Sequence, residues 1–116
     1  MDPIKLKNHR EGPEARIQRD LIEFLKVRNW YVKVLHGSIY QSGMPDLYII
    51  QRRYGRRFIE VKNAKSFKFT AAQWIDFPRM VSEGEQIWVL TAATEAEYQK
   101  LFQKPNLWVY MGNFHK

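Results

Sequence analysis

The alternation of apolar and polar residues predicts that the fold begins with one amphipathic helix. Ile17, Leu21 and Leu25 follow each other at intervals of four residues, so their side chains form one apolar stripe. The helix is predicted over residues 13–28, and Pro13 suits its start, where a missing N–H group has no helical partner to lose. We expect the stripe to pack against a sheet formed by the segments that follow.

Three segments rich in β-forming residues are expected to form a meander of strands. They cover residues 30–36, 46–52 and 58–62, and the middle one is apolar on both faces, which indicates burial within the sheet. Gly55 lies in the short turn that is predicted to join the last two strands. We therefore expect these two strands to form a hairpin.

The second half of the sequence predicts two more helices and two more strands. Thr70 and Gln73 form a Ser/Thr-x-x-Gln capping box, which marks the start of a helix. Residues 86–92 are predicted as a fourth strand, a short helix follows to about residue 103, and residues 107–111 are predicted as a last strand. The order α-β-β-β-α-β-α-β defines an α/β or α+β layer fold.

Candidate chemistry gathers at one end of the predicted hairpin. Asp46 opens its first strand, and Glu60 and Lys62 share one face of its second strand because side chains alternate in direction. Phosphodiester hydrolysis requires a neutralised phosphate, an activated water and a stabilised leaving oxygen, and Mg²⁺ held by one or two carboxylates supplies all three. We therefore expect Asp46 and Glu60 to bind a divalent cation, with the Val61 carbonyl as a third ligand. Lys62 is expected to orient the attacking water or to pair with the phosphate.

Each of these residues also has a purely structural explanation. Glu14 in the first turn of a helix complements the helix dipole, Gln73 completes a capping box, and Glu60 with Lys62 fits a solvated strand face. Glu14 becomes a metal ligand, or the holder of a metal-bound water, only if the first helix lies across the sheet. The motifs are more specific in combination, because a Gly-x-Pro-Asp, a hairpin, an Ile-Glu-Val-Lys and a helix with an early Gln occur in this order.

The composition limits the class of protein. A chain of 116 residues with 45% hydrophobic residues suits a single domain, expected at residues 12–116 after a basic arm at residues 1–11. The net charge of +7 favours a polyanionic partner such as nucleic acid. The lack of cysteine excludes disulfides and thiolate chemistry, and no apolar run reaches the length of a membrane helix. We expect a cytoplasmic protein with no membrane partner and no organic cofactor.

The segment at residues 63–69 mixes cations with aromatic rings. Such a loop grips a nucleic-acid backbone and stacks on bases, or its Phe side chains pack inwards, and the sequence leaves both alternatives open. The candidate DNA-binding residues come from this loop, from the first helix and from a loop with two glycines at residues 37–45. They are Lys65, Lys68, Arg16, Arg19 and Ser42.

Taken together, the motifs resemble the PD-(D/E)xK nuclease superfamily and, within it, the VRR-NUC (virus-type replication-repair nuclease) family. Pro45-Asp46 and Glu60-Val61-Lys62 match the superfamily motif, and the segment that begins at Gly43 matches Gly-x-Pro-Asp-Leu. The helix that carries Glu14 and the helix that carries Gln73 stand where the family has its first and last motifs. The resemblance covers roughly residues 12–92.

The resemblance implies a restriction-endonuclease-like α/β fold, with an αβββαβ core and a mixed central sheet flanked by helices. It implies a site that binds Mg²⁺ or Mn²⁺. The residues that it assigns to this site are three metal ligands, a catalytic lysine and a supporting glutamine, namely Glu14, Asp46, Glu60, Lys62 and Gln73. Short stand-alone members, often phage-encoded, are similar to enzymes that nick four-way DNA junctions as homodimers.

We therefore predict a metal-dependent, structure-selective DNA endonuclease that acts at four-way (Holliday) junctions as a homodimer. The alternatives are a restriction-like or general DNA-nicking nuclease and a nucleic-acid-binding module without catalytic activity. Trp88, Trp108 and Tyr110, all expected on late strands, form either a dimer interface or part of the ordinary core.

Overall fold

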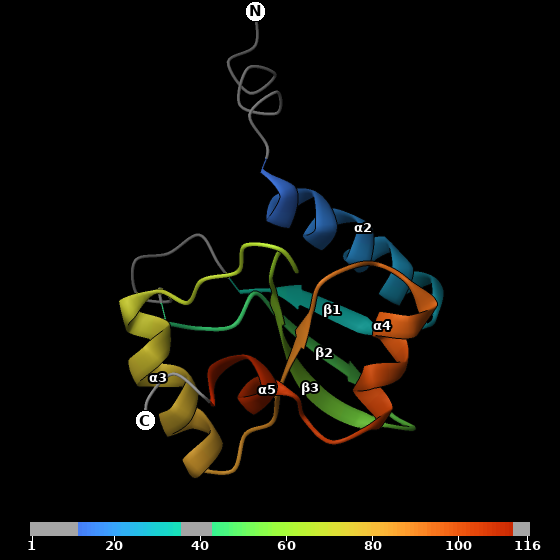
Figure 1. Cartoon of the computed structure of the whole chain (residues 1–116). Helices are drawn as coiled ribbons and strands as arrows, with labels where there is room; N and C mark the ends of the chain where they lie inside the picture. The colour runs from blue at the N-terminus through green and yellow to red at the C-terminus, as the bar shows by residue number, and fades with distance from the viewer. Residues whose placement is uncertain (1–11, 36–42, 113–116) are drawn as a thin grey trace, which may run out of the picture.

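A four-stranded mixed sheet forms the centre of the molecule, with helices around it (Figure 1). The computed structural model describes residues 12–35 and 43–112. The strands β1 (Tyr31–Val34), β2 (Leu47–Gln51) and β3 (Gly55–Val61) are antiparallel neighbours, and β4 (Ile87–Leu90) pairs in parallel with β3. The predicted meander, the mixed sheet and the αβββαβ order are therefore confirmed.

One face of the sheet is covered by the first helix, α2 (Pro13–Val27), and by α4 (Glu95–Gln99) with the 3-10 turn η2 (Lys100–Phe102). Leu21 and Leu25 of the predicted stripe are fully buried there. Burying such apolar surface stabilises the fold by about 25 cal/mol per Å², so the stripe is what holds α2 on the sheet. Gly12 precedes the helix and Pro13 begins it, as predicted.

The other face is covered by α3 (Ala71–Ser82) and by α5 (Leu107–Met111). Phe77 of α3 and Met111 of α5 are fully buried against β4, and Phe58 of β3 packs at the edge of this cluster. The sheet thus has an α2 face and an α3 face, and successive residues of β3 point to them in turn.

The prediction of a strand at residues 107–111 is wrong, because these residues form α5. The side chain of Asn106 occupies the free edge of β4: its Oδ1 accepts from the Val89 N–H at 2.6 Å, and its Nδ2 donates to the Val89 carbonyl at 2.9 Å. This amide makes the two hydrogen bonds that a fifth strand would make with Val89. Leu107 and Met111 then lie one helical turn apart and are both buried.

No helix within the described ranges is long and apolar enough to span a membrane. The predicted basic arm at residues 1–11 lies outside those ranges, as does Ser42.

Candidate active site

The candidate site begins where β2 and β3 end their pairing. The last matched pair of the ladder is Leu47 with Ile59. Beyond it the Asp46 carboxylate replaces a strand partner, because its Oδ2 accepts from the Val61 N–H at 2.8 Å. The N–H and C=O groups of one residue in an antiparallel ladder point to the same neighbour, so the Val61 carbonyl lies on the Asp46 side of β3. The structure thus brings Asp46 and the Val61 backbone together.

Glu60 and Lys62 lie on the α3 face of β3 and are both buried, with relative exposures of 2% and 3%. Lys62 Nζ is 3.0 Å from Glu60 Oε2. The prediction that they share one face is confirmed, but the alternative of a solvated strand face is wrong. Buried ion pairs are weak stabilisers of a fold, because desolvation of two charges offsets their attraction. This pair therefore needs a reason beyond folding stability.

Gln73 holds the two charged groups in place. Its Nε2 donates to Glu60 Oε2 at 3.0 Å, and its Oε1 accepts from Lys62 Nζ at 3.1 Å. The predicted capping box is present as well: Gln73 Oε1 accepts from the Thr70 N–H, and the Thr70 hydroxyl accepts from the Gln73 N–H. The start of α3 thus fixes the amide that bridges Glu60 and Lys62.

Lys62 has two further neighbours that the sequence analysis did not assign to the site. Its Nζ donates to the Lys68 carbonyl at 2.6 Å, and the Phe69 ring centroid lies 4.5 Å from the same nitrogen. Carbonyl dipoles and aromatic faces both favour a cation. The loop at residues 63–69 therefore forms one wall of the site.

The Glu60 carboxyl is the least satisfied polar group of the described residues. Burial, together with the nearby Asp46 carboxylate, raises the pKa of Glu60 to about 8, although Lys62 and Gln73 act in the opposite direction. Its Oε1 is buried and has no hydrogen-bond partner among the residues that the structure describes. An orphaned buried carboxylate oxygen costs free energy unless a cation or a donor approaches it.

Glu14 reaches the same end of β3 from the α2 face. Its Oε2 accepts from the Asn63 N–H at 3.0 Å, one residue beyond Lys62. Within residues 12–35 and 43–112 no three acidic or histidine side chains form a group that could hold a metal ion. The Asp46 carboxylate is close enough to Glu60 to raise its pKa, whereas Glu14 is held at the Asn63 N–H and does not complete a group of three with them.

The residues present fit one divalent cation. Glu60 Oε1 lacks a partner within residues 12–35 and 43–112, the Asp46 charge raises the pKa of Glu60, and the Val61 carbonyl lies beside Asp46. Mg²⁺ needs only one or two protein carboxylates and completes its shell with waters and substrate oxygens. Glu14 accepts from the Asn63 N–H, and direct ligation and the holding of a metal-bound water, the two roles expected of it from the sequence, both stay predictions.

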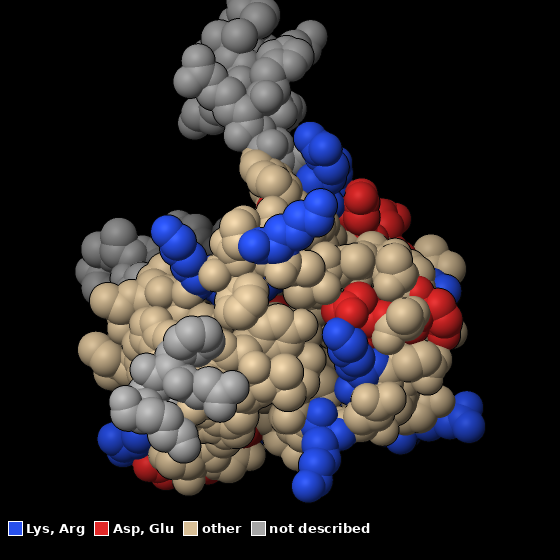
Figure 2. Space-filling model, in the orientation of Figure 1, with Lys and Arg blue, Asp and Glu red and all other residues tan. Residues whose placement is uncertain are grey.

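The candidate DNA-binding residues are exposed wherever the structure describes them, and they are Arg16, Arg19, Lys65 and Lys68. Figure 2 shows Lys and Arg side chains at separate places on the visible face, with acidic side chains between some of them. The aromatic residues of the loop are half-buried: Phe69 contacts Trp74 and Phe77, and Phe67 contacts Tyr110.

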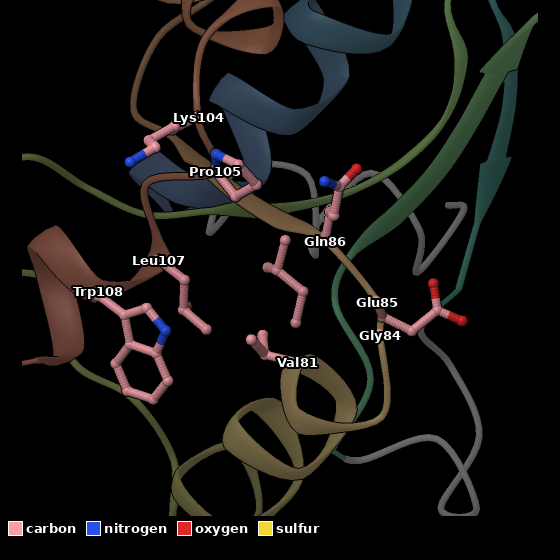
Figure 3. Close-up of a pocket in the computed structure, with 9 residues that line it drawn as sticks. Val81, Gly84, Glu85, Gln86, Lys104, Pro105, Leu107 and Trp108 are labelled. Atoms are coloured by element: carbon pink, nitrogen blue, oxygen red, sulfur yellow. The ribbon is translucent and has the colours of Figure 1, made fainter.

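A pocket of about 360 Å³ lies away from these residues, between the end of α3, the start of β4 and α5. Val81, Leu107 and Trp108 face one another across it (Figure 3). The pocket lies where the parallel strands β3 and β4 begin, whereas the candidate site lies where they end, so none of the site residues lines this pocket.

One contact near the site has no signal in the sequence. A Cβ at Gly43 would lie 1.8 Å from Asp76 Oδ2 and 3.0 Å from Asp76 Cβ, so a larger residue there requires the Asp76 side chain of α3 to move away. The glycine before Pro45-Asp46 is thus explained by close packing of two segments that are far apart in the sequence.

The comparisons with known proteins agree with this architecture. No family model matches the sequence, and no curated protein matches it. A solved structure described as a "VRR_NUC domain" is similar, with a TM-score of 0.61 and 24% sequence identity, over 75% of this chain and 92% of that chain. The chain therefore has a restriction-endonuclease-like α/β fold. Its arrangement of helices and strands is similar to that of the VRR_NUC domain, the family that the motifs resemble.

Proposed function

We propose that this chain is a metal-dependent DNA nuclease of the PD-(D/E)xK type and belongs to the VRR-NUC family. The observation that carries the proposal is the buried cluster of Glu60, Lys62 and Gln73 beside Asp46, with one Glu60 oxygen that lacks a partner. A buried pair of opposite charges with an orphaned oxygen is costly for a fold, whereas perturbed carboxyl groups of this kind are typical of catalytic sites. The fold of the VRR_NUC domain supports the same function.

Asp46, Glu60 and the Val61 carbonyl would hold Mg²⁺ or Mn²⁺, with Glu14 nearby. A divalent cation in this place neutralises phosphate charge and lowers the pKa of a bound water. The Val61 N–H donates to Asp46 Oδ2 and so holds the Asp46 carboxylate against β3, in a position suited to this role. Glu60 must lose its proton before it can bind a cation, since metal ligands act in their deprotonated form.

Lys62 supplies the positive charge that is closest to the carboxylates. Gln73 and the Lys68 carbonyl hold its ammonium in one position, and Glu60 Oε2 is its third partner, so the ammonium exchanges one of these contacts when it meets the substrate. It orients the attacking water or pairs with the scissile phosphate. Gln73 supports the site by keeping Glu60 Oε2 and Lys62 Nζ together, which leaves Glu60 Oε1 for the cation.

The test is cleavage by Asp46→Ala and Asp46→Asn variants. We expect both variants to lose Mg²⁺-dependent cleavage and to keep most of their DNA binding, because a single carboxylate next to a strand end is removed. The matched control is Asp20→Asn, which removes an exposed carboxylate of α2 whose side chain is 60% accessible. If Asp46→Ala still cleaves DNA at the rate of the wild-type protein, the site assignment is wrong.

The substrate that we propose is branched DNA, in particular the four-way junction, cut by a homodimer. Exposed Trp108 and Val109 on α5 support an interface, with 41% and 75% of their surface accessible, whereas Trp88 is buried in the core. Rates on four-way junction, flap and linear duplex separate this substrate from that of a restriction-like or general nicking enzyme. Binding without metal-dependent, EDTA-sensitive cleavage would instead identify a binding module.

A further inference from the structure

A small aromatic hollow adjoins the candidate active site. Phe67, Lys68, Phe69 and Trp74 line it, and its volume is about 240 Å³. The three rings are half-buried and meet edge to face, with centroids 6.2 Å apart for Phe67 and Phe69 and 5.6 Å apart for Phe69 and Trp74. Tyr110 supports Phe67 from outside the hollow at 5.2 Å. The rings are therefore held in place before any ligand arrives.

The hollow and the candidate site share two components. Phe69 lines the hollow, and its ring centroid is also 4.5 Å from Lys62 Nζ. Lys68 lines the hollow with its own atoms, and its carbonyl accepts from the same nitrogen. A group that enters the hollow is therefore one residue away from the lysine that would meet the phosphate.

We propose that this hollow binds one unpaired nucleobase of the DNA substrate, next to the phosphate that is cut. The inference rests on the proposed nuclease function and names the feature of DNA that the site selects. Aromatic rings stack on any base because every base has a π-face. The exposed Lys68 and Lys65 on the same loop supply positive charge for the phosphates that flank the base.

The chemistry of the hollow favours a nucleobase over an apolar protein side chain. Its rim carries lysine and its inner wall adjoins Lys62, so an occupant with phosphates on either side gains charge contacts that an apolar side chain lacks. A base inside a duplex must first be unpaired and flipped out of its stack, which costs a few kcal/mol, whereas an unpaired base enters at less cost. The hollow therefore selects DNA in which a base next to the cut is already unpaired, as at a branch point or a bulge.

The experiment uses the full chain in EDTA, so that binding is measured without cleavage. The probes are a DNA duplex with 2-aminopurine as a single-nucleotide bulge and the same duplex fully paired. Phe67→Ala and Trp74→Ala are expected to weaken binding of the bulged DNA by about 5- to 100-fold, the range for loss of one base–aromatic stack. Binding of the paired duplex is expected to change less than about threefold, and the 2-aminopurine fluorescence is expected to fall only when the bulged DNA binds the wild-type protein.

Two variants separate stacking from loss of folding. Ile75→Ala removes a neighbouring side chain of α3 that is 71% exposed and does not line the hollow, so it is the matched control. Trp74→Phe keeps a ring and is expected to retain binding of the bulged DNA within about threefold of the wild-type protein. Thermal unfolding followed by circular dichroism measures whether each variant is folded.

Three outcomes overturn the inference. They are equal binding of bulged and paired DNA by the wild-type protein, unchanged binding of bulged DNA by folded Phe67→Ala and Trp74→Ala, and unchanged 2-aminopurine fluorescence. Cleavage with Mg²⁺ is measured in parallel on the same two DNAs. Cleavage without preference for the bulge contradicts base binding in the hollow but agrees with the proposed nuclease activity. Bulge-selective binding without cleavage contradicts the nuclease activity but agrees with base binding in the hollow.

Discussion

At the scale of single residues, Glu60 determines how the site responds to pH. Its pKa in the folded protein is raised from 4.5 to about 8, chiefly by burial. A carboxyl whose pKa is higher in the folded than in the unfolded protein stabilises the fold fully below the unfolded value, and this contribution is lost as the pH rises through the folded value. The affected range here extends from pH 4.5 to about 8.

We therefore expect the metal-free wild-type protein to lose more stability between pH 5.5 and 8.5 than the Glu60→Gln variant does. Glutamine keeps the size and the contacts to Gln73 and Lys62 but cannot ionise, so a difference of a few kcal/mol is expected, at about 1.4 kcal/mol for each pKa unit. Thermal unfolding in EDTA at several pH values measures it, and each protein serves as its own reference.

Glu23→Gln, an exposed glutamate of α2, is the control for this comparison. Parallel loss of stability by wild-type protein and Glu60→Gln would contradict the raised pKa. Added Mg²⁺ provides a second measurement: it is expected to stabilise the wild-type protein more at pH 8.5 than at pH 5.5, because binding requires the ionised carboxylate. The Gln variant is expected to show much less of this effect.

At the scale of elements, local sequence patterns predicted most of the fold. They failed where a contact between residues far apart in the sequence determines the structure. The alternation of Ile59, Glu60 and Val61 assigned each side chain to its correct face, and the capping box located Gln73. The spacing could not reveal that Glu14 would accept from the Asn63 N–H without completing a group of three acidic side chains, because this depends on how α2 lies on the sheet. Nor could it predict the close approach of α3 to Gly43.

The failed prediction of a strand at residues 107–111 has the same origin. Its residues are apolar and suited to a strand, but the Asn106 amide already pairs with the free edge of β4. Once that edge is satisfied, the chain gains more by burying Leu107 and Met111 on one helical face. The i, i+4 spacing of these two residues after Pro105-Asn106 is the signal that predicts the helix.

This explanation predicts the effect of removing the Asn106 amide. Asn106→Ala leaves the Val89 N–H and C=O without partners at the edge of β4, so we expect a loss of roughly 1–3 kcal/mol of unfolding free energy. An unprotected strand edge also promotes pairing with other chains, so aggregation on heating is expected to increase. Urea unfolding and light scattering measure the two effects.

Asn106→Asp separates the two hydrogen bonds, because aspartate keeps an acceptor for the Val89 N–H and loses the donor to the Val89 carbonyl. Because the second carboxylate oxygen then faces the Val89 carbonyl and repels it, Asn106→Asp is expected to be destabilised at least as much as Asn106→Ala at neutral pH. Lys104→Ala, an exposed change in the same connection, is the control and is expected to alter stability by less than about 0.5 kcal/mol. A stability of Asn106→Ala equal to that of Lys104→Ala would leave α5 unexplained.

At the scale of the whole molecule, the proposed substrate sets a requirement. A four-way junction is resolved by cuts in two strands, so two active sites are needed. The described residues contain one candidate catalytic cluster, built on the ends of β2 and β3. The net charge of +7 draws the protein to DNA, but Figure 2 shows no single basic patch on the visible face. Long-range attraction of this kind does not distinguish DNA shapes, so the proposed preference for a junction requires a further feature, such as two sites in one homodimer.

A homodimer with twofold symmetry matches the two equivalent strands of a junction, and this has a direct consequence for mixed dimers. Wild-type dimers are expected to convert a supercoiled plasmid with an extruded cruciform into linear product within one binding event. A dimer of one wild-type and one Asp46→Asn subunit, purified through two different tags, is expected to stop at the nicked circle. Gel electrophoresis of reactions in Mg²⁺ separates the linear plasmid from the nicked circle. A dimer of two Asp46→Asn subunits is expected to give neither product.

Sedimentation provides the independent measurement for this prediction. The chain has a mass of 14.0 kDa, so a dimer is expected at about 28 kDa, twice that value, and at this mass plus that of the DNA in the complex. Because exposed Trp108 and Val109 of α5 support the interface, Val109→Glu places a charge in it and is expected to favour the monomer. If Val109→Glu still sediments as a dimer, α5 is not the interface. If the wild-type protein is monomeric with and without junction DNA, paired cutting requires two separate binding events, and nicked circles must then accumulate for wild-type protein as well.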